Sequence, residues 1–149
     1  MTKLGVGIVG KNWAARGHLP AWRMLPERCA PVAICTTNLE TAEPAARDLG
    51  LPKAYGDFDA MLADPEIAIV SLGGPPPART EMTLKALAAG KHVFSCIPFA
   101  VSASDAHRMA DAAAARGLSE PSTPISCGPP ATAISGSWST MVFWATSTR

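Results

Sequence analysis

Short apolar runs that alternate with helical segments constrain the fold of this chain more than any other feature of its sequence. The runs are LGVGIVG (4–10), PVAICT (31–36), IAIVSL (67–72) and KHVFSC (91–96), with a weaker one at KAYG (53–56). Runs of this length, bounded by turn residues and without polar alternation, are typical of strands buried on both faces. Strands that alternate with helices form a parallel sheet covered by helices on both sides. The sequence therefore predicts an α/β fold with a doubly wound parallel sheet.

The segments between the runs carry the start and stop signals of helices. A glycine ends each of the expected helices at 39–50, 75–90 and 102–117, and prolines open the second of them. Proline in the first turn and glycine after the last turn are typical of helix ends. A serine is expected to cap the start of the third helix, and Asp57 the start of a further, short helix.

The composition excludes several classes of protein. Of the 149 residues, 13 are basic and 12 acidic, and a net charge of +1 gives no case for binding nucleic acid or an anionic membrane. Because no run of about 18 uncharged apolar residues occurs, no membrane-spanning helix is expected. The N-terminus lacks the apolar stretch of a signal peptide, so we expect a cytoplasmic chain. The cysteines match no metal-binding spacing, no metal is expected, and reduced thiols are predicted at Cys29, Cys35, Cys96 and Cys127.

The loop after the first strand carries a candidate phosphate-binding motif. Residues 10–15, GKNWAA, match G-x-G-x-x-G/A, with Asn12 in place of the second glycine and Ala15 in the last place. In that motif the first glycine forms a tight turn, and the second lets the backbone approach a pyrophosphate. Asparagine is the non-glycine residue that best tolerates positive φ, so the turn is expected to survive with Asn12 in that conformation, although its side chain would crowd the phosphates. A glycine-rich first strand without a ligand is the alternative interpretation.

The end of the second strand bears on the choice of cofactor. NAD-binding domains usually place a carboxylate there, which binds the ribose hydroxyls. Here the strand ends in Thr36, Thr37 and Asn38. Without a negative charge to repel a 2′-phosphate, and with hydroxyls that can donate to it, the sequence favours NADP. No arginine is adjacent to strengthen that preference.

Four stretches of the chain resemble one known family. They are VGIVGKNWAARGHLPAWRMLP, VAICTTNLETAEPAARDLGLPKAYGDFDAML, DPEIAIVSLGGPPPARTEMTLKALAAGKHV and DAHRMADAAAARG. Over residues 4–118 the chain resembles the N-terminal part of the Gfo/Idh/MocA oxidoreductases, and within them it is most similar to the galactose-dehydrogenase and galactose-repressor branch. The resemblance implies a Rossmann-type sheet of order 3-2-1-4-5-6. It also implies NAD(P) as cofactor and a sugar, polyol or related carbonyl compound as substrate.

The resemblance also implies where the cofactor would bind, at the carboxyl ends of the strands. The pyrophosphate would lie against Gly7, Gly10, Asn12, Trp13 and Ala15. The adenosine ribose would face Thr36, Thr37 and Asn38. The groove toward the nicotinamide would be lined by Leu72, Gly73, Gly74 and Pro75, and its reacting end by Cys96 and Pro98.

Departures from the family put its chemistry in doubt. The family's Glu-Lys-Pro motif reads Cys96-Ile97-Pro98, and Ile97 cannot donate a hydrogen bond or carry a charge, so no catalytic residue is assigned. Arg79, in the place of a usual histidine, is expected to be solvated. Cys96 is a core thiol or, alternatively, a reactive one. A structural or surface role is expected for His18, and structural roles are expected for His92 and His107. The family's C-terminal substrate domain is expected to be absent, which predicts a truncated form that is inactive alone; the alternative is a non-catalytic, nucleotide-binding regulatory module.

Composition changes abruptly near residue 118. Residues 119–149 hold seven serines, against four in the 118 residues before them. The sequence therefore predicts a dinucleotide-binding domain over 1–118 and an irregular or disordered tail over 119–149, which could also be out of frame. Because the tail offers no sixth strand, residues 91–96 are expected to form an exposed sheet edge that promotes self-association.

Overall fold

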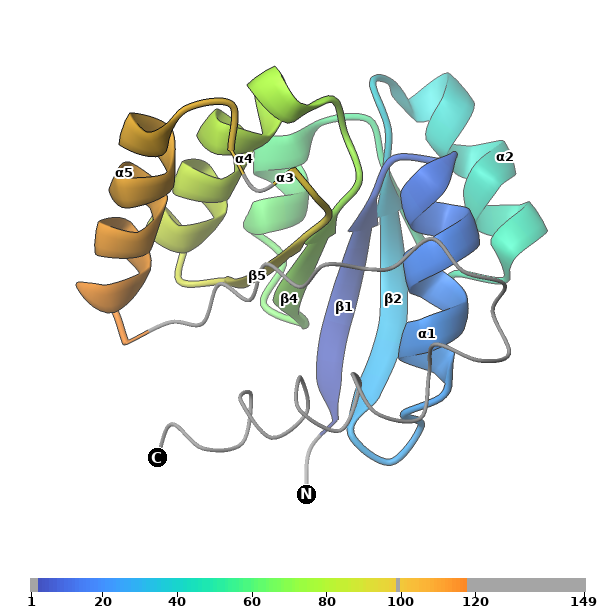
Figure 1. Ribbon diagram of the computed structural model, residues 1–149. Coiled ribbons are helices and arrows are strands. Elements are labelled where there is room, and N and C mark those ends of the chain that lie inside the picture. The colour runs from blue at the N-terminus through green and yellow to red at the C-terminus, as the bar shows by residue number, and fades with distance from the viewer. Residues whose placement is uncertain (1–2, 99, 118–149) are drawn as a thin grey trace, which may run out of the picture.

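Five parallel strands form the centre of the molecule in the computed structural model, which describes residues 3–98 and 100–117 (Figure 1). The strands are β1 (Leu4–Val9), β2 (Cys29–Cys35), β3 (Lys53–Tyr55), β4 (Ile67–Leu72) and β5 (His92–Ser95). Their order is β3-β2-β1-β4-β5. The predicted class and the first five places of the predicted strand order are confirmed. The expectations for the tail, and for Cys127 within it, lie outside the described residues.

Helices connect the strands, and their ends follow the capping signals of the sequence. They are a π-helical turn η1 (Ala14–His18) continued by α1 (Leu19–Arg23), then α2 (Leu39–Leu49), α3 (Phe58–Leu62), α4 (Pro76–Ala88) and α5 (Ala103–Ala114). The Asp57 side chain accepts hydrogen bonds from two backbone N–H groups of α3, and Ser102 accepts one from Asp105 of α5. Gly50 ends α2 at φ +60°. These caps were predicted because each depends on a few neighbouring residues only.

The helices cover both faces of the sheet, so the molecule has two apolar cores. Helices α1 and α2 lie on one face and α3, α4 and α5 on the other (Figure 1). Ile8, Trp22 and Phe94 belong to the first core, and Met61 and Leu87 to the second. Within residues 3–98 and 100–117, no helix has the length and apolarity needed to cross a membrane.

The central strand β1 positions the loops that matter for function. Its last residue, Val9, lies opposite Cys35 of β2 and Leu72 of β4. The three strands therefore end at the same level. The loops that follow them emerge side by side at the carboxyl edge of the sheet.

Candidate functional site

A pocket of about 370 Å³ opens at the carboxyl edge of the sheet, where the loops after β1, β4 and β5 meet. It is lined by Trp13, Gly73, Gly74, Pro76, Arg79, Cys96 and Ile97. The sequence pointed to these loops because ligands of doubly wound sheets bind beyond the carboxyl ends of the strands. The pocket wall is largely apolar, with one cation in it.

Two glycines allow the β1 and β4 loops to approach each other closely. Gly10 has φ +97°, and a Cβ built there would lie 3.2 Å from the carbonyl oxygen of Gly73. A Cβ built on Gly73 would lie 2.4 Å from the Cβ of Ala14 and 3.0 Å from its nitrogen. The Gly73 N–H donates to the Val9 carbonyl oxygen at 3.1 Å. Only glycine fits at these two positions without a backbone shift.

The expectation that Asn12 adopts positive φ is wrong. Among the described residues, only glycines have positive φ. Gly10 alone reverses the chain direction, so Asn12 already belongs to the first helical turn, and its carbonyl oxygen accepts a hydrogen bond from the Arg16 N–H at 3.0 Å. The Asn12 residue is exposed, so its carboxamide remains at the surface beside the loop.

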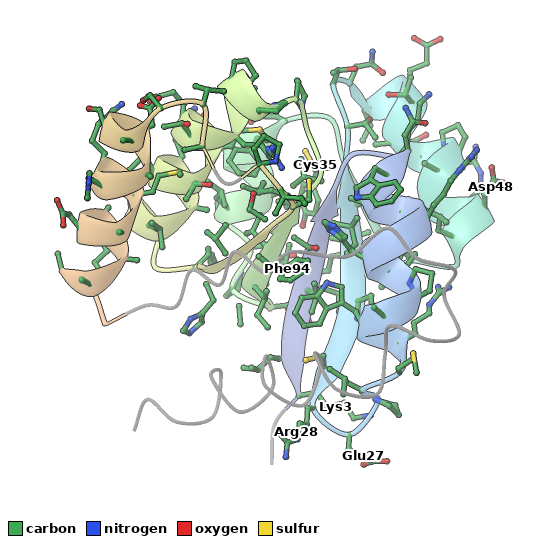
Figure 2. All side chains as sticks on the ribbon, viewed as in Figure 1. Lys3, Glu27, Arg28, Cys35, Asp48 and Phe94 are labelled. Atoms are coloured by element: carbon green, nitrogen blue, oxygen red, sulfur yellow. The ribbon has the colours of Figure 1, made fainter. Side chains whose placement is uncertain are left out.

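The π-helical turn η1 directs His18 into the first core. The Leu19 N–H bonds to the Ala14 carbonyl oxygen, five residues earlier, which is the π pattern. His18 is fully buried, with its Nδ1 2.9 Å from Ser71 Oγ, and Trp22 Nε1 donates to the same oxygen at 3.1 Å. The ring of Phe94, labelled in Figure 2, packs edge-on against both, with centroids 4.9 Å from His18 and 5.5 Å from Trp22. His18 is therefore a core residue and not a surface one.

His18 is neutral in this environment. Burial, and to a lesser degree the positive charge of Arg79, lower the pKa of His18 to about 4. Its Nε2 is buried without a hydrogen-bond partner. A proton on the ring would therefore be poorly solvated and would be repelled by the guanidinium.

Arg79 is buried, so the expectation of a solvated side chain is wrong. It is only 1 % exposed. Nη1 donates to the Cys96 carbonyl oxygen at 2.5 Å and Nη2 to the Pro98 carbonyl oxygen at 2.7 Å, while Nη1 lies 2.6 Å from Cys96 Sγ. The guanidinium thus joins α4 to the loop after β5. A helical spacing could have indicated its burial, because Arg79 shares one face of α4 with the buried residues Thr83, Ala86 and Leu87.

Two of the three residues that follow β2 use their side chains for hydrogen bonds within the loop that leads to α2. The Thr36 hydroxyl donates to the Asn38 carbonyl oxygen at 2.9 Å and lies 2.7 Å from Thr41 Oγ1. The Asn38 side-chain oxygen accepts from the Thr41 N–H at 2.9 Å, so Asn38 is the N-cap of α2. Thr37 is exposed at the same edge. The capping role of Asn38 was not predicted, although asparagine just before a helical segment is the usual signal for it.

The structure brings only some of the predicted site residues to the pocket. Trp13, Gly73, Gly74 and Cys96 line it, together with Ile97 and with the additional residues Pro76 and Arg79. The other predicted residues do not line it. Gly7 is inside β1, where a Cβ would lie 3.0 Å from Met61 Sδ, Ala15 and Leu72 are core residues, and Pro75 is the N-cap of α4. Pro98 contacts Arg79 through its carbonyl oxygen, and the remaining five lie in the loops after β1 and β2 described above: Gly10, Asn12, Thr36, Thr37 and Asn38. In the described part of the chain, no three His, Cys, Asp or Glu side chains lie together as a metal site would require.

A family model matches most of the chain. It is described as an oxidoreductase family with an NAD-binding Rossmann fold, GFO_IDH_MocA, and it covers residues 4–119. The trans-1,2-dihydrobenzene-1,2-diol dehydrogenase of Sus scrofa is 32% identical over 113 residues, which are 75% of this chain and 34% of that protein. The curated relatives are longer: the chain spans about a quarter to a third of their length.

Solved structures of similar fold contain both nicotinamide cofactors. A levoglucosan dehydrogenase in complex with NADH and levoglucosan superposes with a TM-score of 0.73 and 26% identity, over 78% of this chain and 33% of that one. A mutant 3-ketoreductase from Actinomadura kijaniata, in complex with TDP-benzene and NADP, gives a TM-score of 0.74 and 27% identity, over 82% of this chain and 38% of that one. The fold is therefore compatible with either cofactor.

Proposed function

The chain belongs to the Gfo/Idh/MocA oxidoreductase family, and on that premise we propose that it is the NAD(P)-binding domain of an oxidoreductase. Its proposed substrate is a sugar, a polyol or a related carbonyl compound, as for the relatives named as dihydrodiol and inositol dehydrogenases. The single observation that carries the proposal is the pocket itself. It is lined by Gly73, which packs against the Gly10 turn, and it opens at the carboxyl edge of a doubly wound sheet.

The residues around this edge suit a dinucleotide. The backbone turn at Gly10 and the start of the helix after it would face the pyrophosphate, because a helix N-terminus attracts negative charge. Thr37 and Asn38 would face the adenosine ribose. The nicotinamide ring would enter the pocket between Trp13 and Ile97, which are both 48 % exposed and offer apolar surface.

A preference for NADPH over NADH is the first expected result. The three residues directly after β2, where the family of NAD-binding domains usually places a carboxylate, are Thr36, Thr37 and Asn38, so none of them repels a 2′-phosphate. The Thr36 hydroxyl is bonded within the loop, so the exposed Thr37 hydroxyl and the Asn38 amide are the donors left for that phosphate. Replacing Thr36 with Asp should shift the preference toward NADH by roughly tenfold, about 1.4 kcal/mol of charge repulsion. Titration of each reduced dinucleotide, followed by its own fluorescence, measures both constants.

Thr36→Asn is the matched control, since it changes the side chain at this position without adding charge. It should leave the ratio of the two affinities close to that of the unaltered chain. Tighter binding of NADH than of NADPH by the unaltered chain would contradict the proposed preference. Failure of both dinucleotides to bind would contradict the proposed function.

The position of Ile97 bears on catalysis. A bound nicotinamide cofactor supplies hydride transfer at its ring, and the substrate oxygen must lose or gain a proton in the same reaction. Ile97 lines the pocket where the family carries a lysine, and its side chain can neither hold nor donate that proton. The chain's own contribution is therefore to bind the ring and to exclude water from it.

We expect the 149-residue chain to show no turnover of sugars, polyols or sugar acids with NAD or NADP. The reason is the apolar side chain at the proton-transfer position. Absorbance of the reduced cofactor measures the rate. If turnover above background appears, and if Gly10→Val abolishes it by blocking the turn, the expectation is wrong.

The alternative function is a non-catalytic, nucleotide-binding regulatory module. Ile97 is the observation that favours it, because such a module needs cofactor binding without proton transfer. Translation of the other reading frames of the gene beyond codon 118 separates the two functions. A family-like substrate domain in another frame favours the oxidoreductase, and unrelated sequence there favours the module.

Other expectations from the sequence stay predictions within this proposal. They are a domain boundary near residue 118, a chain that is inactive alone, a cytoplasmic location, and self-association through residues 91–96. The described residues include β5 as the last strand in the sheet order, which is where such an association would occur.

A further inference from the structure

We propose that Cys96 is a redox-sensitive site within the pocket, where a hydroperoxide oxidises its thiol to a sulfenic acid and Arg79 favours the reaction. The inference goes beyond cofactor binding. It rests on the accessibility of one thiol and on the charge placed against it.

Cys96 is the accessible thiol among the three cysteines of residues 3–98 and 100–117. Cys29 and Cys35 are buried, at 8 % and 2 % exposure. Burial raises the pKa of Cys29, and burial together with Asp57 raises the pKa of Cys35 to about 11, so both remain protonated. Cys96 is only partly buried and lines the pocket, through which a small oxidant can reach it.

The guanidinium of Arg79 places a permanent positive charge against the sulfur. Nη1 lies 2.6 Å from Cys96 Sγ, within hydrogen-bonding contact. The arginine is nearly fully buried, so water screens its charge little. None of the ion pairs formed by the described residues includes Arg79, so no carboxylate neutralises it there. Reactive cysteines occur in such electropositive, partly exposed surroundings.

Arg79 also keeps one buried donor without a partner. Its Nε is buried and has no hydrogen-bond partner, although the residue lines the pocket. An unpartnered buried donor costs free energy, of about 1–3 kcal/mol. An oxygen atom bonded to the neighbouring sulfur would be a new acceptor beside the guanidinium.

The proposed step balances with hydrogen peroxide as the co-reactant. The Cys96 sulfur attacks one peroxide oxygen, an S–O bond forms and the O–O bond breaks. The sulfur loses two electrons to the peroxide, and the electron pair of the broken O–O bond stays on the departing oxygen. That oxygen takes the thiol proton and leaves as water.

Oxidation would change what the pocket can hold. This consequence rests on the proposed function, in which the nicotinamide ring enters the same space. The added oxygen would occupy part of that space and would present a polar group to an apolar ring. The oxidised chain should therefore bind NADPH more weakly than the reduced chain.

Dimedone trapping on the full chain tests the proposal. The chain is treated with hydrogen peroxide and dimedone, and samples taken at successive times are digested with trypsin. Mass spectrometry of the labelled peptides then gives the rate at which each cysteine is labelled. Cleavage places Cys96 in peptide 92–108, Cys29 and Cys35 together in 29–47, and Cys127 in 117–149, so each label is assigned by its peptide. Cys96 in the folded chain should react about tenfold faster than in the synthetic peptide 92–108, which has the same thiol without Arg79.

Two substitutions at Arg79 and one at Cys96 provide the controls. Cys96→Ser should remove the label from peptide 92–108 only. Arg79→Met should slow labelling of Cys96 to the rate of the free peptide, while Arg79→Lys should retain part of the acceleration. Circular dichroism establishes that each variant is folded, and if Arg79→Met is not, the folded chain against the free peptide decides.

Two results would overturn the proposal. One is a folded chain that labels Cys96 no faster than the free peptide does. The other is a folded Arg79→Met chain that labels it at the unaltered rate.

NADPH at saturation should protect Cys96. Rapid labelling without protection would leave the thiol site intact and would contradict the placement of the nicotinamide ring in the pocket.

Discussion

Replacing Gly73 with alanine is expected to destabilise the chain by about 3 kcal/mol and to weaken dinucleotide binding at least about tenfold. The new methyl group would lie 2.4 Å from the Ala14 Cβ and 3.0 Å from the Ala14 nitrogen. Neither atom can move without moving the helix after β1. The loops after β1 and β4 would have to separate, and the pocket between them would change shape. Urea unfolding and NADPH titration measure the two effects.

Gly74 offers a matched control one residue away. A Cβ built there meets no heavy atom within 4 Å, and its φ is not positive. Gly74→Ala should therefore change the free energy of unfolding by no more than about 0.5 kcal/mol. If the two variants were equally stable, the close approach of Gly73 to Ala14 would not exist in solution.

The second large effect is a loss of stability in mild acid that depends on His18. Its pKa is about 4 in the folded chain, against about 6.5 in an unfolded one. Between these values the unfolded chain binds a proton that the folded chain does not, so acid favours unfolding. The free energy of unfolding therefore keeps its full value, as far as His18 is concerned, above pH 6.5. It falls by about 3 kcal/mol as the pH is lowered from 6.5 to 4. Urea midpoints across this range measure it.

His18→Gln separates this effect from other titrating groups. Glutamine is uncharged at every pH, so the variant, although less stable at pH 7, should lose much less stability between pH 6.5 and 4. His92 is the matched control, because burial also lowers its pKa but the residue is only partly buried. His92→Gln should retain most of the acid sensitivity. An unaltered pH dependence in the His18 variant would show that its ring is accessible to protons.

Local signals explain why much of the fold was predictable. The strand Ile67–Leu72 has the predicted bounds, because its apolar run is limited on both sides by turn residues. The caps at Asp57, Ser102 and Gly50 each depend on contacts within a few residues. Such contacts are encoded in short stretches of sequence.

The candidate site was less predictable, because it depends on contacts between distant segments. Arg79 is held by carbonyl groups 17 and 19 residues later in the chain, and nothing beside it in the sequence indicates them. The π pattern of η1, which brings His18 to Ser71, likewise depends on how the helix packs on β4. The backbone conformation of Asn12 was predicted wrongly, because the positive φ of the turn is at Gly10.

The bonds from Arg79 to the Cys96 and Pro98 carbonyl groups also have an entropic consequence. Ordering one residue of a free loop costs about 1–2 kcal/mol. The residues from Cys96 to Pro98 are already tied to α4 at both ends, so a ligand that enters the pocket does not have to order them. Binding to a preformed wall loses little free energy to the ordering of the protein, so the affinity depends mainly on how well the ligand's shape fits the pocket. Its rigidity should therefore make the pocket selective for flat, ring-shaped groups over flexible chains of the same area.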